Sequence, residues 1–197
     1  AALEAVVSSV DDAMSPFKAS SEISNINAAR DRNWHPVSGQ TGIVVAKSLQ
    51  VARLTDGAFD PTVGPIVGRF GFGPIAGNSV AGYKNIQFDG DKIRKTVPDA
   101  ALDLCGIAKG HALDRMADVL TGQKVNSFLL EAGGEVLAHG RHPNGRPWQV
   151  GIELPKSNPL TFQRVVKLGG TALATSGDAV NGGQAGGISF NHIIDPQ

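Results

Sequence analysis

The sequence has little of several features that would define particular classes of protein. It has one cysteine in 197 residues, which excludes an internal disulfide and leaves the redox compartment open. Aromatic residues make up 6% of the chain and charged residues 18%, and 18 basic side chains balance 18 acidic ones. This balance argues against a dedicated nucleic-acid-binding protein and against a disordered, self-repelling chain. No apolar run approaches the roughly 18 residues expected of a membrane span.

Glycine is abundant, with 25 residues, and 41% of the chain is hydrophobic. The length and composition predict a globular protein with many turns and a sizeable core, and we expect one domain over residues 1–197. A helical pattern is already running at Ala1, and a strand pattern enters a turn at Gln197. We therefore interpret the sequence as an internal stretch of a longer protein, so that the lack of a signal peptide is uninformative.

Hydrophobic spacing predicts helices over residues 3–14, 42–54 and 108–120, with a short capped helix within 18–27. Glycine and proline are dense over 57–82, which predicts a structured loop with one helical turn.

Alternating apolar residues on both sides of Asp89-Gly90-Asp91 predict a hairpin. Helices first and antiparallel strands later, without regular alternation, predict the α+β class. Six further strands are expected, within 101–104, 125–130, 135–138, 148–153, 164–168 and 188–194.

The segment Leu102–Gly110 joins a carboxylate, a glycine turn and a lysine. Asp103 is expected at the end of a strand, Gly106 in the turn, and Lys109 in the first turn of a helix. Amides at a helix N-terminus together with an ammonium suit a phosphate. The spacing of a Walker loop is absent, and an ordinary strand-to-helix turn with an exposed lysine explains the pattern better. We expect Cys105 to pack as a small apolar residue.

A second motif, Asp56–Pro65, places an aromatic ring beside a carboxylate. Pro61 holds Asp60 in an extended conformation, so the position of its carboxylate is predictable. Phe59 could offer its ring to a flat ligand. An ordinary turn with a core phenylalanine explains the motif equally well.

Three further segments are weaker signals. The paired glycines of Glu131–Glu135 allow close approach to a ligand or form a bulge, and the bulge is favoured. The segment Thr175–Asp178 lacks the glycine setting of a hydrolase nucleophile. In a strand, His192 would point opposite to Asp195, and it is either a general base or a structural histidine. The other histidines lack zinc-ligand spacing.

Taken in series, these segments resemble the ApbE family, the FAD:protein FMN transferases. The resemblance covers nearly the whole chain. It is most specific in Asp-Gly-Ala-Phe-Asp-Pro-Thr, at 56–62, and in Gly-Ile-Ala-Lys-Gly, at 106–110. The series consists of 14–24, 56–65, 102–110, 132–135, 175–178 and 192–196.

The resemblance implies an α+β fold with a T-fold-related core of antiparallel sheet and packed helices. It implies a magnesium-dependent transfer of FMN from FAD to a serine or threonine of a target redox protein, with release of AMP. It also implies a periplasmic or membrane-anchored location, with any anchor outside this chain. An FAD pyrophosphatase that yields FMN and AMP, or a non-catalytic FAD-binding protein, are the alternatives.

Particular roles follow from the resemblance, residue by residue. His192 would be the base that activates the acceptor hydroxyl, and the backbone carbonyl of Gly106 would help to hold Mg²⁺. Phe17 stands where the family often has a tyrosine that stacks on FAD. The residues implied to contact FAD are Phe17, Ala58, Phe59, Asp60, Asp103 and Lys109.

The sequence also departs from the family pattern. The family's aspartate and threonine metal ligands lie beyond Gln197, and its first strand is missing, so we expect this stretch alone to bind magnesium poorly. Cys105 stands where glycine or serine is common. Phe17 lacks the hydroxyl of a tyrosine, so it can stack but cannot donate a hydrogen bond.

Overall fold

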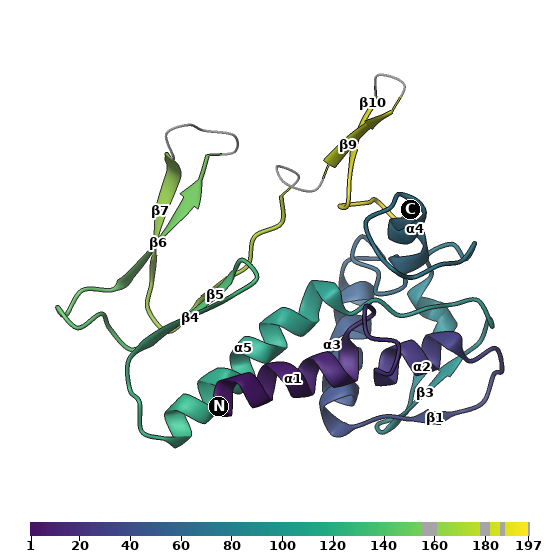
Figure 1. The fold of residues 1–197 in the computed structure, drawn as a ribbon, viewed down its shortest axis with the longest axis horizontal. Coiled ribbons are helices and arrows are strands. Elements are labelled where there is room, and N and C mark those ends of the chain that lie inside the picture. The colour runs from purple at the N-terminus through teal and green to yellow at the C-terminus, as the bar shows by residue number, and fades with distance from the viewer. Residues whose placement is uncertain (155–160, 178–181, 186–187, 197) are drawn as a thin grey trace. The chain divides into compact units, whose positions relative to one another are not determined.

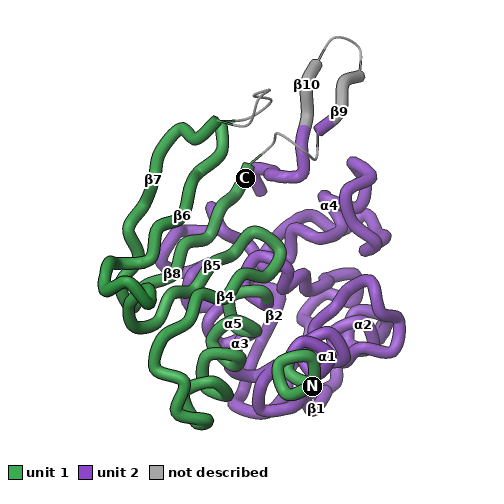
Figure 2. The backbone as a smooth tube through the Cα atoms, turned by 60° about the vertical axis from the view of Figure 1, so that its left-hand side comes forward, with its two compact units in different colours: residues 1–6, 109–180 green, residues 7–108, 181–197 purple. Residues whose placement is uncertain are grey.

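A computed structural model describes residues 1–154, 161–177, 182–185 and 188–196 (Figure 1). The chain divides into two compact units (Figure 2). Unit 1 consists of Ala1–Val6 and Lys109–Val180, and unit 2 of Val7–Ala108 and Asn181–Gln197. Helices and antiparallel strands make up both, which confirms the predicted α+β class.

Four helices precede the first hairpin, and side-chain caps explain where two of them begin. Ser21 caps α2 by accepting a hydrogen bond from the Ser24 amide at 3.0 Å. Ser38 caps α3 in the same way, and α3 therefore begins at Gly39, three residues before the predicted start. The helices are α1 (Ala2–Met14), α2 (Glu22–Ala28), α3 (Gly39–Leu54) and α4 (Gly64–Arg69), followed by the 3₁₀ turn η1 (Tyr83–Asn85).

The core of unit 2 forms where α2 and α3 bury one face each. Ile23, Val44, Val45 and Ala52 are at most 1% exposed, and Ile93 of the small sheet is fully buried. That sheet has the antiparallel order β1-β3-β2, and it includes the predicted hairpin. The strands of unit 2 are β1 (His35–Pro36), β2 (Ile86–Phe88), β3 (Lys92–Lys95), β9 (Gly182–Ala185) and β10 (Ile188–Asn191).

The strand predicted over 101–104 is wrong. The Asn27 side chain takes the hydrogen bonds that a neighbouring strand would have made. It accepts from the Leu102 amide at 2.7 Å and donates to the Leu102 carbonyl at 2.8 Å. A single amide side chain thus satisfies both backbone groups of Leu102.

Unit 1 contains most of α5 (Cys105–Gly122) and two antiparallel sheets, of order β4-β5-β8 and β6-β7. Val136, Ala138 and Leu168 form its buried cluster, against which Trp148 and Val150 pack. The strands are β4 (Phe128–Ala132), β5 (Glu135–His139), β6 (Trp148–Glu153), β7 (Phe162–Leu168) and β8 (Ala172–Leu173).

The predicted bulge at the paired glycines is also wrong. Ala132 and Glu135 pair directly, so Gly133 and Gly134 are the two central residues of a tight hairpin turn. Both have positive φ, 59° and 91°, which is the backbone conformation that such a turn requires.

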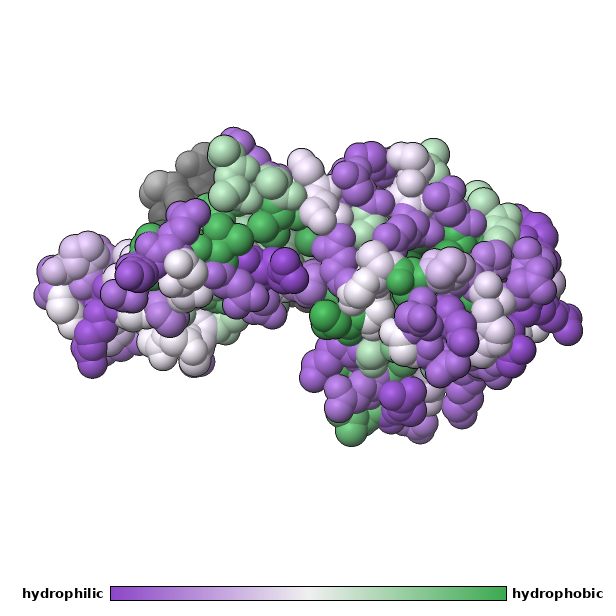
Figure 3. All heavy atoms as spheres, turned by 90° about the horizontal axis from the view of Figure 1, so that it is seen from below, coloured by the Kyte–Doolittle hydropathy of each residue, from purple (hydrophilic) through white to green (hydrophobic). Residues whose placement is uncertain are grey.

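The face of the molecule in Figure 3 is mostly hydrophilic, with smaller groups of hydrophobic residues. Within the described ranges, no helix has the length and hydropathy needed to cross a membrane.

Candidate active site

The N-terminus of α5 is built around Asp103. Its Oδ1 accepts a hydrogen bond from the Cys105 amide at 3.0 Å, which satisfies one of the unpaired amides of the first helical turn. This contact explains why α5 begins at Cys105, three residues before the predicted start. The side chain of Cys105 is exposed, which corrects the prediction that it packs as an apolar residue.

Phe59 lies against the first turn of α5. A Cβ built on Gly106 would lie 3.2 Å from Cε2 of the Phe59 ring, so the ring covers the glycine closely. Phe59 follows the C-terminus of α3, where the chain turns sharply. There the Gly57 amide donates a hydrogen bond to the Ala52 carbonyl at 2.8 Å. Phe59 is half-buried, and Ala58 beside it is exposed.

Asp60 is buried, and hydrogen bonds occupy both of its oxygens. Oδ1 accepts from the amide of Thr62 at 2.7 Å and from its hydroxyl at 2.6 Å, while Oδ2 accepts from the Tyr83 amide at 2.9 Å. The Thr62 hydroxyl accepts in turn from the Gly82 amide at 2.7 Å. The carboxylate therefore fixes both ends of the glycine-rich segment 60–83.

Sequence reasoning missed Thr62 and Tyr83 as partners of Asp60. The aspartate followed two residues later by threonine was an available signal, because aspartate often bonds the backbone two residues on. Nothing in the sequence pointed to Tyr83, which lies 23 residues away.

The start of α4 packs directly on Asp103. A Cβ on Gly64 would lie 3.0 Å from the Asp103 Cβ and 2.6 Å from Cδ1 of Ile75, so the helix start approaches both side chains closely. The Asp103 amide also donates to the Pro61 carbonyl at 2.7 Å. Unit 2 thus joins the two motif segments through these contacts between Pro61, Gly64 and Asp103.

Phe17 is 71% exposed. It lies in the turn between α1 and α2, which is held where the Ser21 hydroxyl donates to the Ser15 carbonyl at 2.7 Å. Its ring is thus presented to solvent on an ordered turn, where a flat ligand could stack on it.

His192 lies in a bend just after β10, not in a strand as predicted. The Asn191 side chain accepts from the Ile193 amide at 2.8 Å, and this local bond takes the place of strand pairing. The half-buried His192 ring meets Phe72 edge-on, with centroids 6.2 Å apart. Phe72 belongs to the glycine-rich segment that Asp60 fixes.

Lys109 belongs to unit 1, where it contacts the turn between β4 and β5. Its ammonium lies 2.9 Å from Oε2 of Glu135 and donates to the Gly133 carbonyl at 3.1 Å. The paired glycines that looked like a bulge in the sequence are therefore neighbours of this lysine.

The described residues do not make a complete magnesium site. Within those ranges no group of three or more His, Cys, Asp or Glu side chains could hold a metal ion. Gly106 supplies one backbone carbonyl, whereas Mg²⁺ takes six ligands in near-octahedral geometry.

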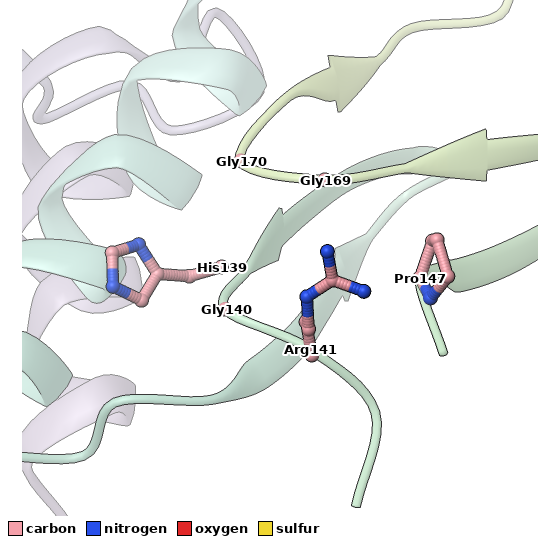
Figure 4. Close-up of a pocket in the computed structure, with 6 residues that line it drawn as sticks. All are labelled: His139, Gly140, Arg141, Pro147, Gly169 and Gly170. Atoms are coloured by element: carbon pink, nitrogen blue, oxygen red, sulfur yellow. The ribbon is translucent and has the colours of Figure 1, made fainter. Parts of the chain in front are cut away.

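Unit 1 also contains a pocket of about 420 Å³ (Figure 4). None of the predicted site residues lines it. Thr175 to Gly177 form an exposed stretch elsewhere, and Asp178 of that motif lies outside the described residues. The lining residues are His139, Gly140, Arg141, Pro147, Gly169 and Gly170.

The chain belongs to the ApbE family, whose family model matches residues 1–197. It is 34% identical over 207 residues to an FAD:protein FMN transferase of Vibrio cholerae, covering 98% of this chain and 62% of that protein. An Escherichia coli K12 protein of the same name is 30% identical over 204 residues, covering 95% of this chain and 58% of that protein. The chain therefore spans about 60% of the length of these curated relatives.

Solved structures agree with this assignment. The flavin transferase ApbE from Vibrio cholerae superposes with a TM-score of 0.87 at 32% identity, covering 99% of this chain and 66% of the other. The ApbE protein from Thermotoga maritima gives a TM-score of 0.87 at 29% identity, covering 99% of this chain and 67% of the other. The family predicted from the order of the motifs is thus confirmed.

Proposed function

We propose that this chain is part of an FAD:protein FMN transferase. Its reaction transfers FMN from FAD to the hydroxyl of a serine or threonine in a target redox protein and releases AMP. The observation that carries the proposal is the contact of the two most specific motif segments in unit 2. Phe59 covers Gly106, and Pro61 and Gly64 contact Asp103.

The proposed step exchanges one phosphorus–oxygen bond for another. The acceptor oxygen attacks the FMN phosphorus, a bond forms between them, and the bond from that phosphorus to the AMP phosphate breaks. AMP leaves with the electron pair of the broken bond. The acceptor hydroxyl proton passes to His192, because an imidazole nitrogen can accept a proton.

The remaining residues bind and orient FAD in this proposal. Phe17 offers an exposed ring for stacking, and Phe59 with Ala58 lines the site beside the first turn of α5. Lys109 supplies positive charge to the phosphates. Asp60 contributes indirectly by holding the glycine-rich segment, since both of its oxygens already have backbone or hydroxyl partners.

Magnesium dependence is proposed for the longer protein. Bound Mg²⁺ would neutralise charge on the diphosphate of FAD. The Gly106 carbonyl would be one ligand, and the family resemblance implies aspartate and threonine ligands elsewhere in the longer protein. Localisation outside the cytoplasmic membrane, with an anchor beyond this chain, is likewise proposed from the family resemblance.

Mass spectrometry of a target protein tests the function. The longer protein is incubated with FAD, Mg²⁺ and a target that carries an acceptor threonine, while chromatography follows AMP and FMN. A target heavier by one FMN unit, with an equal amount of AMP and loss of both on chelation, supports the transferase. AMP with free FMN and an unmodified target would instead identify a pyrophosphatase.

His192→Ala separates an enzyme from a binding protein. We expect this variant to bind FAD with wild-type affinity and to transfer no FMN. FAD that stays intact with the wild-type protein would identify a non-catalytic FAD-binding protein and would remove the proposed role of His192.

A further inference from the structure

The turn between β4 and β5 holds the Lys109 ammonium at two points. Glu135 lies 2.9 Å from Nζ and bears the opposite charge, and the Gly133 carbonyl accepts from Nζ at 3.1 Å. All three residues belong to unit 1 (Figure 2). We propose that Glu135 is a positioning residue, which acts on FAD through Lys109 and orders its ammonium for the nucleotide phosphates.

The turn lies close against the stem of Lys109. Gly133 has φ of 59°, and a Cβ on it would lie 3.1 Å from the Lys109 Cδ. A side chain at position 133 would therefore strain the turn and press on the lysine stem. Glu131 supports the same turn, because its Oε1 accepts from the Gly134 amide at 2.9 Å.

The two members of the ion pair differ in exposure. The Glu135 side chain is 14% exposed and the Lys109 side chain 48%, so the carboxylate is mostly enclosed while the ammonium still faces solvent. An ammonium has three N–H donors; the Gly133 carbonyl accepts from one of them, and Glu135 contributes its opposite charge at ion-pair distance. The exposed side of the ammonium therefore has N–H donors to offer a phosphate oxygen.

Ordering the lysine in advance has an energetic consequence. A free lysine loses much of its rotamer entropy when a ligand fixes it, and that loss weakens binding. Glu135 and Gly133 remove part of that loss before FAD arrives. Removing Glu135 should therefore weaken FAD binding, although it also removes a negative charge near the phosphates.

A double-mutant cycle on the longer protein tests this inference, which rests on the proposed function. We expect Glu135→Ala to raise KM for FAD about tenfold, which corresponds to about 1.4 kcal/mol, with kcat changed less than twofold. In a protein that already carries Lys109→Ala, adding Glu135→Ala should change KM for FAD little further, because the glutamate acts through the lysine. Glu135→Gln, which keeps an oxygen acceptor, should restore much of the loss.

Other outcomes would overturn it. Unchanged or tighter FAD binding in Glu135→Ala would mean that the carboxylate does not help or competes with the phosphate. If the increase in KM of the double variant equals the product of the two single-variant increases, the two residues act independently. Glu153→Ala, at the end of β6 in the same unit, is the matched control and should leave KM unchanged.

A second measurement does not depend on FAD. Acetic anhydride labelling followed by peptide mass spectrometry reports how readily the Lys109 amine reacts. We expect Lys109 to react several-fold faster in Glu135→Ala than in wild type, while Lys124 reacts equally in both. Equal Lys109 rates would contradict the inference. If the wild-type protein binds no FAD, the proposed function fails, and with it the role toward the nucleotide, whatever the labelling shows.

Discussion

The Asp60 carboxylate accepts a hydrogen bond from the Tyr83 amide at 2.9 Å, across 23 residues of chain. Asp60 is only 7% exposed, and its other oxygen is held by Thr62. The family resemblance implies that Asp60 contacts FAD directly. The structure shows that Asp60 also holds the two ends of segment 60–83 together. The two roles make different predictions.

We expect Asp60→Ala to lower the free energy of unfolding by about 3 kcal/mol, because three donors lose a charged acceptor. Urea unfolding measures this loss. Thr62→Val should lower stability by less, and Thr62→Ser, which retains the hydroxyl, should stay near wild type. An Asp60→Ala variant of normal stability but weak FAD affinity would show that the carboxylate acts on FAD directly.

Among the glycines described in segment 60–83, Gly68 has the least space for a side chain. A Cβ there would lie 2.1 Å from the backbone carbonyl oxygen of Ile75, which cannot move without shifting the chain. We expect Gly68→Ala to destabilise the protein by about 2 kcal/mol or more in thermal or urea unfolding. Gly39→Ala, at the first residue of α3 with open space around it, should be neutral or slightly stabilising.

The exposed ring of Phe17 allows binding to be separated from folding. Because the side chain is 71% exposed, Phe17→Ala should change the free energy of unfolding by less than about 0.5 kcal/mol. FAD affinity, measured by fluorescence titration, should fall about tenfold with the loss of stacking, which corresponds to about 1.4 kcal/mol. Leu54→Ala, at a position 77% exposed, should change neither quantity, and unchanged FAD affinity in Phe17→Ala would contradict stacking at this position.

His111 of α5 should make stability depend on pH. Burial, and secondarily the nearby Arg115 charge, lower the pKa of His111 below its ordinary value of 6.5. Its Nε2 is buried without a hydrogen-bond partner among the described residues. The unfolded chain then binds the proton more readily, so stability is fully present above about pH 6.5 and falls as the pH drops below it.

Urea unfolding at pH 7.5 and pH 5.5 measures this effect. We expect His111→Gln to lose less stability than wild type between these two pH values, whereas the exposed His139→Gln should behave as wild type. An identical loss in wild type and His111→Gln would assign the acid sensitivity to other groups.

Local patterns in the sequence predicted the longer helices and the hairpin of β2 and β3. The serine cap of α2, the proline after α1 and the Asp89-Gly90-Asp91 turn act over a few residues, so their effect can be recognised in a single stretch of chain. Two of the strand predictions failed for the same reason, because an asparagine side chain took the backbone bonds. The strand expected over 101–104 is replaced by bonds from Asn27, and the strand through His192 ends at a bond made by Asn191.

The sequence by itself determined the α+β class and the family, because periodicity and ordered motifs are properties of the chain alone. Only the tertiary structure decided which partners the motif residues have. Tyr83 binds Asp60, Phe59 covers Gly106, and Glu135 pairs with Lys109. The reason is that a hydrogen bond or an ion pair depends on distances of about 3 Å, and residues far apart in sequence reach such distances only once the chain has folded.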